Sequence, residues 1–379
     1  MNLRADSYLA RPRTRGSVTL QEIRQQPDLW GATLNQIASL PFLAELTGHP
    51  TIVCGAGSSA YAAASVARAW PNARAIPTTD LLVLSKEEVP SIFPAFAEGG
   101  LLVSLARSGD SPESIGVIAR FQKLFPELMH CAITCNQEGQ LARMPGIVSI
   151  VLDPRTNDHS LVMTGSFSNL VLAGLAFTHW QSLVPRLSQI SANIKRVIPE
   201  LETLARQLAA RKPCRVAILT SPGLAPLAQE ASLKILEMTA GRVLALPETY
   251  LGLRHGPMSF LTKDSLVVCI LSSDGHRRPY ELDLIRELRD KALGCLVVVG
   301  LPEPEDDLAH YTVPALAPDL IDGFRTPFEI VFPQLLGYYL SLSLNLDPDN
   351  PSPNGVITRV VRKFQLHDSD SSASITRLI

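Results

Sequence analysis

Two segments rich in serine and glycine have the composition of phosphate-binding loops. The first, Cys54-Gly55-Ala56-Gly57-Ser58-Ser59-Ala60, follows an apolar run and opens a helical pattern. Glycines permit a tight turn and close approach of the backbone, and the free N–H groups at a helix start attract anions. Gly57, Ser58 and Ser59 are therefore candidate ligand contacts. The same letters also match the GxGxxA dinucleotide fingerprint, with Asp80 in the ribose position, and fit a plain serine-capped turn.

The second segment, Leu105–Ser114, places Arg107, Ser108 and Ser111 around another expected helix start. Hydroxyls and backbone amides there suit a phosphate monoester, and an arginine adds charge-assisted hydrogen bonds. A dinucleotide fold needs no second serine-rich loop of this kind, whereas a small phosphorylated ligand does. Helix capping alone, by Ser111 with its neighbours Glu113 and Ser114, is the alternative interpretation.

Candidate acid–base residues occur in the second half of the chain. The expected helix Leu224–Ala240 carries Glu230, Lys234 and Glu237 at spacings of four and three, which places them along one face. A Glu–Lys face exposed to solvent is the alternative. His255 precedes a Gly-Pro pair and is therefore held on a rigid turn, where an imidazole can exchange protons near neutral pH. Glu237 and His255 are the candidate catalytic pair, although a lone loop histidine can also be inert.

The elements that must position these residues follow a strand–helix alternation, which predicts an α/β fold with parallel sheets covered by helices on both faces. After an N-terminal helical arm within residues 1–45, two halves (46–195 and 196–379) repeat the same order, which indicates a tandem duplication of one doubly wound unit. Apolar runs predict strands at Thr51–Cys54, Arg74–Pro77, Leu101–Leu105, Cys131–Thr134, Ile147–Leu152, Arg215–Thr220, Arg242–Leu246, Ser265–Leu271 and Cys295–Val299. A helical region, Phe167–Leu208, joins the halves.

Composition excludes several classes of protein. Of 379 residues, 46% are hydrophobic and 18% charged, which argues against general disorder. A net charge of −2 argues against a nucleic-acid binder. Six cysteines in mostly apolar runs, and the lack of an apolar stretch in the first sixteen residues, predict a reduced cytoplasmic protein without a signal peptide. Leu161–Trp180 is expected to be a buried helix and not a membrane span, and the spacing of histidines and cysteines predicts no metal site.

Together these segments resemble the sugar isomerase (SIS) family of phosphosugar-binding domains. The resemblance is carried by GAGSSA, SLARSGDSPES, ITCNQEGQLAR, MTGSFSNLVLAG, LKILEMTAGRV and LRHGP, with IRQQPDLW before them and LDPDNPSPNGVITRVV after them. It covers nearly the whole chain. The closer match is to the tagatose-6-phosphate ketose/aldose isomerases, now regarded as galactosamine-6-phosphate deaminases, and the isomerase half of glucosamine-6-phosphate synthase is a more distant relative.

The resemblance implies a role for each candidate residue and implies no metal, nucleotide or other cofactor. The implied phosphate contacts are Ser59, Ser108 and Ser111, with Arg107 beside them and Ser58 near the sugar. Glu237 is the implied proton carrier. His255 is the implied ring-opening residue and is supplied in this family by a neighbouring subunit, so the resemblance also implies a homodimer or larger assembly.

One departure from the synthase relatives bears on the direction of the reaction. Those relatives carry a tail lysine that forms an imine with the ketose, but this chain has no lysine between Asp349 and Gly355, and the next is Lys363. We therefore expect degradation of a 2-amino-2-deoxyhexose 6-phosphate, with galactosamine 6-phosphate favoured, to ketose 6-phosphate and ammonia. The alternatives are aldose/ketose isomerisation without deamination, a non-catalytic sugar-phosphate sensor, and a dinucleotide-dependent oxidoreductase.

Overall fold

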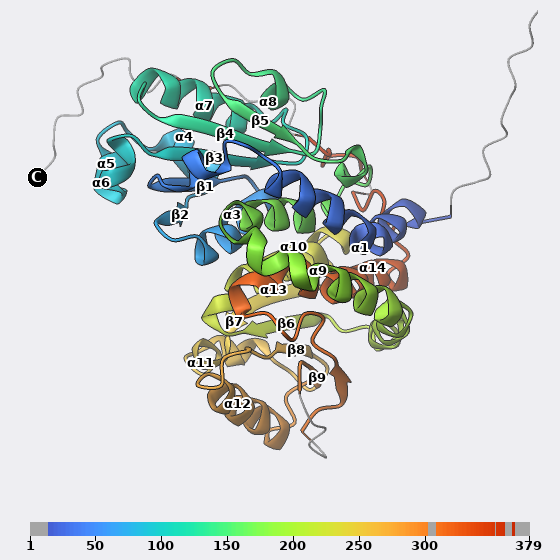
Figure 1. Cartoon of the computed structure of the whole chain (residues 1–379). Helices are drawn as coiled ribbons and strands as arrows, with labels where there is room; N and C mark the ends of the chain where they lie inside the picture. Colours follow the sequence, from blue (N-terminus) through green and yellow to red (C-terminus); the bar gives the residue numbers. More distant parts are fainter. Residues whose placement is uncertain (1–13, 302–307, 353, 361–365, 368–379) are drawn as a thin grey trace, which may run out of the picture.

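The computed structural model describes residues 14–301, 308–352, 354–360 and 366–367, and places two parallel five-stranded sheets on either side of a layer of helices (Figure 1). Lys363 lies outside the described residues. The helices are α1 (Ser17–Ala38), α2 (Leu43–Thr47), α3 (Ser58–Ala69), α4 (Thr78–Val83), α5 (Glu88–Ile92), α6 (Pro94–Ala97), α7 (Pro112–Leu124), α8 (Gln140–Arg143), α9 (Gly165–Ala210), α10 (Ala225–Met238), α11 (Tyr250–Leu253), α12 (Arg278–Asp290), α13 (Asp322–Glu329) and α14 (Val331–Ser343).

The first sheet has the strand order β2-β1-β3-β4-β5 and is parallel throughout. Its strands are β1 (Thr51–Cys54), β2 (Ala73–Ala75), β3 (Leu101–Ala106), β4 (Met129–Thr134) and β5 (Val148–Val151). Alternate residues of one strand enter different cores: Val53 packs toward the central helices, and its neighbours Ile52 and Cys54 pack toward the outer helices. Both faces of this sheet are therefore covered, as the unbroken apolar runs predicted.

The second sheet has the order β10-β9-β8-β6-β7, so its strands follow one another as those of the first sheet do. They are β6 (Arg215–Thr220), β7 (Leu244–Thr249), β8 (Leu266–Ile270), β9 (Cys295–Val299) and β10 (Tyr311–Val313). The prediction for β7 is displaced, because the apolar run ends at Leu246 whereas the strand continues through Pro247. Proline is tolerated there because β7 is an edge strand.

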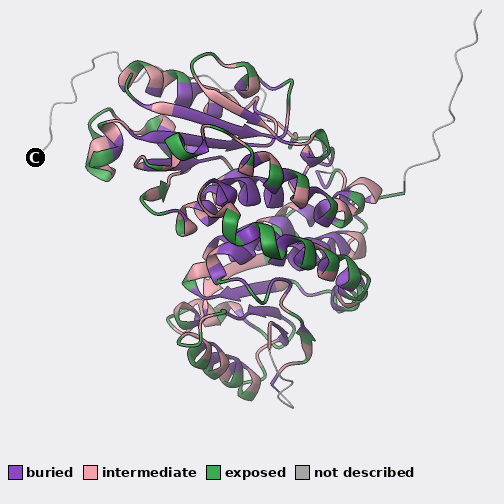
Figure 2. Cartoon of the chain, viewed as in Figure 1, coloured by how far each residue is buried: buried purple, intermediate pink, exposed green. Residues whose placement is uncertain are grey.

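The layer between the sheets is formed by α1, α3, α9, α10, α13 and α14 (Figures 1 and 2). The predicted N-terminal arm is α1, which packs mainly along α9. The longest element, α9, contains the predicted joining region and breaks at His179, whose φ of −135° and ψ of 18° are not helical. Close packing of α3 on α9 depends on Gly174, where an added Cβ would lie 2.4 Å from Cγ2 of Val66. The predicted boundary at residues 195/196 falls inside α9, and the division into domains stays a prediction.

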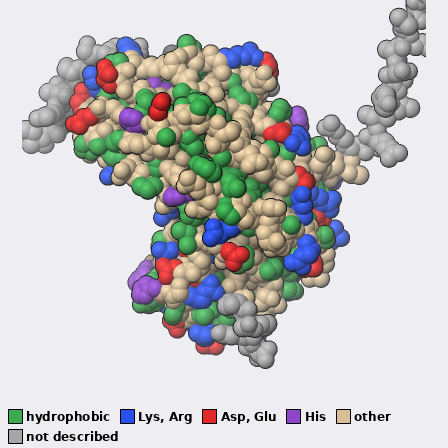
Figure 3. Space-filling view, in the orientation of Figure 1, with side chains coloured by type: hydrophobic (Ala, Val, Ile, Leu, Met, Phe, Trp, Pro, Cys, Tyr) green, Lys and Arg blue, Asp and Glu red, His purple; other side chains and the backbone are tan. Residues whose placement is uncertain are grey.

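Four further findings concern the predicted classes of site and surface. No helix in the described part of the chain is both long enough and apolar enough to cross a membrane. Among the same residues there is no group of three or more metal-ligating side chains. All six cysteines are free and only Cys214 is exposed. On the face shown in Figure 3, acidic and basic side chains are interspersed.

Candidate active site

A cavity of about 270 Å³ opens where β1 and β3 end. From β1 the chain continues to β2 on one side of this pair, and from β3 it continues to β4 on the other side. Parallel α/β sheets bind ligands at the position where the strand order reverses in this way. The cavity is lined by seven of the eight predicted site residues: Gly57, Ser58, Ser59, Arg107, Ser108, Ser111 and Glu237. Asp80, the ribose contact of the dinucleotide alternative, is an exposed residue of α4 and does not line it.

The loop after β1 is shaped by its two glycines. An added Cβ at Gly55 would lie 2.4 Å from the carbonyl oxygen of Ser59, and Gly57 has a φ of +58°, which disfavours other residues. This turn starts α3 directly at Ser58. Ser58 and Ser59 are almost fully buried at the helix start and contact the cavity.

The loop after β3 combines helix capping with the lining of the cavity. The Ser111 hydroxyl accepts a hydrogen bond from the Ser114 backbone N–H at 3.3 Å and donates one to Ser114 Oγ at 2.8 Å. The Ser108 hydroxyl accepts from the Asp110 N–H at 3.3 Å. The capping interpretation therefore holds for Ser111, and the same turn presents both hydroxyls to the cavity.

Arg107 is used differently from the sequence-based expectation. Its guanidinium donates to the carbonyl oxygens of Ser160 (3.3 Å), Leu161 (3.1 Å) and Arg359 (2.9 Å). Burial, together with the nearby charge of Arg359, lowers the pKa of Arg107 to about 10. Arg107 thus brings a positive charge to the cavity wall while its N–H groups fasten two distant segments of backbone.

Glu237, Lys234 and Glu230 form a buried polar cluster on α10 that contradicts the interpretation of a solvated helix face. The Lys234 and Glu230 side chains are completely buried, whereas Glu237 is about one-third exposed toward the cavity. Lys234 Nζ lies 2.5 Å from Glu237 Oε2 and 3.4 Å from Glu230 Oε1, and it donates to Ser58 Oγ at 3.0 Å. Lys234 therefore connects the carboxylate on the second half to the loop after β1.

The electrostatics of this cluster separate its two glutamates. Among the described residues, neither oxygen of Glu230 has a hydrogen-bond partner, and burial raises the pKa of Glu230 to about 8. Burial opposes the charge of Lys234, but Glu230 and Glu237 raise its pKa above the usual value. The ammonium group is therefore retained and pairs most closely with Glu237, the carboxylate that reaches the cavity.

His255 is the one predicted site residue that lies elsewhere in the chain's own fold. It follows α11 at the edge of the second sheet, is exposed, and does not line the cavity. In the described part of a single chain, the cavity is therefore lined by the serine loops and the glutamate but by no histidine.

Sequence reasoning missed the wall formed by the segment Ile357–Val360, which lies more than 240 residues after the loop it contacts. Arg359 fixes this segment by donating from Nε to the Asp158 carbonyl at 2.9 Å and from Nη2 to Asn157 Oδ1 at 2.5 Å. The letters TRVV could be matched to the family from the sequence, but Asn157 and Asp158, which Arg359 contacts, belong to no sequence motif. Spatial contact between them could not be deduced from spacing.

The neighbouring wall, which includes Leu161 and Met163, is held by a buried carboxylate from α1. Glu22 accepts hydrogen bonds from the backbone N–H of His159 (2.5 Å) and from the N–H (3.2 Å) and hydroxyl (2.5 Å) of Ser160. Burial and the nearby Asp158 raise the pKa of Glu22 to about 7. The N-terminal arm is thus part of the support of the cavity.

Comparison of the whole chain with known proteins identifies its relatives. A relative from Shewanella sp. (strain ANA-3), D-galactosamine-6-phosphate deaminase AgaS, is 32% identical over 371 residues, which are 92% of this chain and 91% of that protein. A Streptomyces coelicolor relative provisionally given the same name is 33% identical over 371 residues, or 92% of this chain and 95% of that one. The chain belongs to the AgaS family of SIS-type proteins.

Solved structures agree with this assignment. A tagatose-6-phosphate ketose/aldose isomerase from Escherichia coli has a TM-score of 0.79 and 26% identity, with 94% of this chain and all of that chain covered. The C-terminal domain of glucosamine-fructose-6-phosphate aminotransferase from Francisella tularensis, at 17% identity and a TM-score of 0.69 over 86% of this chain and 96% of that one, shares the fold. A scan of general family models gives no match.

Proposed function

We propose that this protein is an enzyme that converts a 2-amino-2-deoxyhexose 6-phosphate, with galactosamine 6-phosphate favoured, to ketose 6-phosphate and ammonia. The observation that carries the proposal is Glu237, held by Lys234 at 2.5 Å, in the lining of a cavity that two serine-rich helix starts also line. The family membership supports the same substrate class, because the Shewanella relative is named D-galactosamine-6-phosphate deaminase.

Substrate binding in this proposal uses the serine loops. The phosphate is held by Ser59, Ser108 and Ser111 and by the backbone amides of the helix starts, with the positive charge of Arg107 behind them. Ser58 lies toward the sugar, next to Lys234. Binding energy from the phosphate then positions the reacting carbons at Glu237.

Chemistry in this proposal is a proton transfer followed by hydrolysis. After ring opening, in which an imidazole moves a proton between O1 and O5, the Glu237 carboxylate removes the proton from C2 and returns it to C1 through a planar enol-amine. The resulting 2-imino ketose adds water and releases ammonia, leaving ketose 6-phosphate. The proposal needs no metal or cofactor.

The imidazole of this scheme is His255 of a second subunit. Support comes from its absence from the lining of the chain's own cavity and from exposed apolar side chains on three elements of this half: Leu236, Leu244 and Leu251 are each about half exposed, on α10, β7 and α11. Such side chains at a sheet edge suit an interface between copies of the chain. We therefore propose a homodimer or larger assembly that shares its active sites.

The equal strand order of the two sheets supports a tandem duplication of one doubly wound unit, with boundaries near residues 45 and 195.

The free, mostly buried cysteines support residence in the reducing cytoplasm.

The deciding experiment measures two reactions with the purified protein. Ammonia release is assayed from galactosamine 6-phosphate and glucosamine 6-phosphate, and exchange of the C2 proton with solvent deuterium is followed in parallel. We expect ammonia from the galacto sugar, and a loss of exchange in Glu237→Gln with ligand binding retained, because the amide keeps its shape but cannot take a proton. Undiminished exchange in Glu237→Gln would assign the base elsewhere, with Glu230 the first candidate.

The second candidate function, isomerisation without deamination, is favoured by the named activity of the Escherichia coli isomerase structure. Tagatose 6-phosphate is therefore included in the same assay. Interconversion of aldose and ketose without ammonia release from any hexosamine phosphate would favour that function. Binding without either reaction would indicate a sugar-phosphate sensor.

A further inference from the structure

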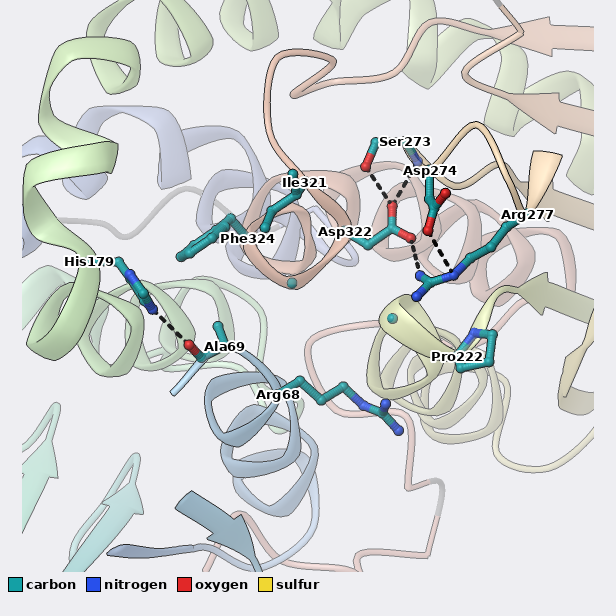
Figure 4. Close-up of a pocket in the computed structure, with 12 residues that line it drawn as sticks. Arg68, Ala69, His179, Pro222, Ser273, Asp274, Arg277, Ile321, Asp322 and Phe324 are labelled. Atoms are coloured by element: carbon teal, nitrogen blue, oxygen red, sulfur yellow. Dashed lines mark hydrogen bonds and ion pairs between the residues drawn. The ribbon is translucent and has the colours of Figure 1, made fainter. Parts of the chain in front are cut away.

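A second cavity, of about 630 Å³, lies at the carboxyl ends of β6 and β8 (Figure 4). In the second sheet these two strands occupy the places that β1 and β3 occupy in the first. The cavity therefore lies at the second switch point of the fold, where ligands bind in parallel α/β sheets. Its far wall comes from the end of α3 and the break in α9, so that it is enclosed by both halves of the chain.

The serine loop of this second position is already occupied by the chain's own carboxylate. Asp322 accepts from Ser272 Oγ (2.5 Å), from Ser273 N–H (2.8 Å) and from Arg277 Nη1 (3.1 Å). Glu281 in turn accepts from Ser221 Oγ (2.5 Å) and from the Ser272 N–H. The hydroxyls that line the first cavity thus have counterparts here that are bonded to fixed carboxylates. A ligand of the second cavity must be held by other groups.

The group that remains available is the guanidinium of Arg68, the last charged residue of α3. Figure 4 shows its side chain extending from the helix into the space below Pro222 and Arg277. Of the residues that the structure describes, none accepts a hydrogen bond from Arg68. Arg277 is the other arginine in the described lining of the cavity. Partial burial and the positive charge of Arg277 lower the pKa of Arg68. Arg277 is itself paired with Asp274 at 3.3 Å and with Asp322 at 3.1 Å. Arg68 is therefore the cation at which a bound anion would gain new charge-assisted hydrogen bonds.

One helix connects this cavity to the first. The N-terminal residues of α3 are Ser58 and Ser59 at the first cavity, and its last residues are Arg68 and Ala69 at the second. Twelve helical residues span about 18 Å. At the second cavity, the Ala69 carbonyl lies 2.7 Å from Nε2 of His179, the residue at which α9 breaks. A ligand that orders this end of α3 can therefore change the other end through a single rigid element.

We propose that the second cavity is a non-catalytic binding site for a small ligand with a phosphate group, held by the Arg68 guanidinium, and that α3 couples its occupancy to the first cavity. Its volume lies in the range of small-molecule sites, and among its described lining residues no glutamate paired with a lysine corresponds to Glu237 and Lys234. Phosphate chemistry can come from a sugar phosphate or from inorganic phosphate. The site does not depend on the proposed reaction, because Arg68 does not line the first cavity.

Calorimetric titration of the Glu237→Gln protein, which leaves a hexose 6-phosphate unconsumed, tests the binding step. We expect two binding events per chain, and we expect Arg68→Ala to weaken one of them about tenfold or more. Arg68→Lys should weaken it less, because the charge is kept. The matched control is Arg186→Ala, an exposed α9 arginine bonded to a backbone carbonyl and lining neither cavity. It should change neither event.

Two results would overturn the binding proposal: a single event per chain, or a second event that is equally weak in Arg68→Ala and Arg186→Ala and hence non-specific. A parallel titration with inorganic phosphate identifies the ligand, because equal affinity assigns the phosphate group alone and weaker affinity assigns the sugar phosphate. If the proposed reaction were wrong but this site correct, the Arg68-dependent event would persist without an event sensitive to Ser108→Ala.

Hydrogen exchange tests the coupling. In a Ser108→Ala/Ser111→Ala protein, which weakens the first site, the ligand should slow exchange at the Ser59 and Ala60 amides, bonded to the Ala56 and Gly57 carbonyls at 3.1 and 2.9 Å. Adding Arg68→Ala should remove this protection. Slower exchange confined to the Arg68 end of α3, with no change at the Ser59 and Ala60 amides, would contradict coupling through the helix.

Discussion

Lys234 lies between two carboxyl groups, one that reaches the cavity and one that is completely buried. Glu230 and Glu237 flank the ammonium group at 3.4 and 2.5 Å, but only Glu237 reaches solvent. Complete burial favours the protonated form of Glu230. The charge of Lys234 then pairs mainly with Glu237 at the cavity. The cluster thus raises the pKa of the buried Glu230 and places the side chain of Glu237, paired with Lys234, at the cavity.

The raised pKa of Glu230 predicts a pH dependence of stability. Its folded-state value of about 8 lies above the ordinary value of 4.5, so the folded protein binds the proton more tightly than the unfolded chain does. This contribution is complete below about pH 4.5 and is lost as the pH rises toward 8. Glu230→Gln does not titrate, and we expect the free energy of unfolding of the wild type to fall relative to that of Glu230→Gln between about pH 5 and 8.

Urea unfolding at a series of pH values measures this difference. Glu200→Gln removes an exposed glutamate of α9 and is the matched control, whose stability should follow that of the wild type at every pH. Parallel curves for wild type and Glu230→Gln would mean that Glu230 is ionised in the folded protein.

Arg359 gives a second residue-scale prediction, because it joins the closing segment to the wall of the cavity. Arg359→Ala loses the bonds to Asn157 and to the Asp158 carbonyl. Loss of hydrogen bonds by a charged group costs about 1.5–3 kcal/mol, so we expect KM for the phosphosugar to rise about tenfold with kcat changed less. Steady-state kinetics measures both parameters.

The matched control for this prediction is Arg242→Ala, which removes one bond from an exposed arginine to the Leu344 carbonyl. It should leave KM unchanged. An equal fall in kcat and kcat/KM for Arg359→Ala, with unchanged KM, would instead place Arg359 in the chemical step.

At the scale of elements, the contact of α3 with α9 is set by a missing side chain. Gly174→Ala would bring a methyl group to 2.4 Å from Val66 Cγ2. Overpacking of this kind costs about 1–3 kcal/mol, and we expect the free energy of unfolding to fall by that amount. Urea denaturation of the single and double variants measures it.

Val66→Ala supplies the rescue in a double-mutant cycle. The Gly174→Ala/Val66→Ala protein should be more stable than the sum of the single changes, because the small residue returns the space that the new methyl group takes. In α1, Gly31 has no atom within 4 Å of an added Cβ, and Gly31→Ala should raise stability by up to about 1 kcal/mol. Additive losses at positions 66 and 174 would show that the contact does not limit packing.

The same elements show what the sequence could predict. β1, β6 and β9 lie where their apolar runs are, because a strand buried on both faces must be apolar along its whole length. β10 was missed: Tyr311–Val313 is three residues long, at the edge of the sheet, and lacks such a run. The serines and Glu237 could be singled out from local chemistry, and they line one cavity, whereas their roles stay predictions. Arg359, Glu22 and the role of Lys234 as a bridge could not be singled out in this way, since each acts through a tertiary contact.

At the scale of the whole molecule, the exposed His255 predicts that activity depends on association. His255→Ala protein and Ser108→Ala/Glu237→Gln protein should each be inactive alone. If the histidine of one chain serves the cavity of another, mixing them regenerates one intact site per mixed dimer, and ammonia release should return to a fraction of the wild-type rate. Size-exclusion chromatography verifies that mixed oligomers have formed, and mixed oligomers without activity would place His255 outside the shared site.

The hydrogen bond from Arg107 to the carbonyl of Arg359 joins positions 252 residues apart. During synthesis, the serine loops leave the ribosome long before the segment that closes their cavity. A chain that stalls after the first sheet can therefore fold its loops without acquiring a working site, and a fragment cut by a protease before residue 357 loses the wall in the same way. Completion of the cavity wall therefore requires a chain that extends through Arg359.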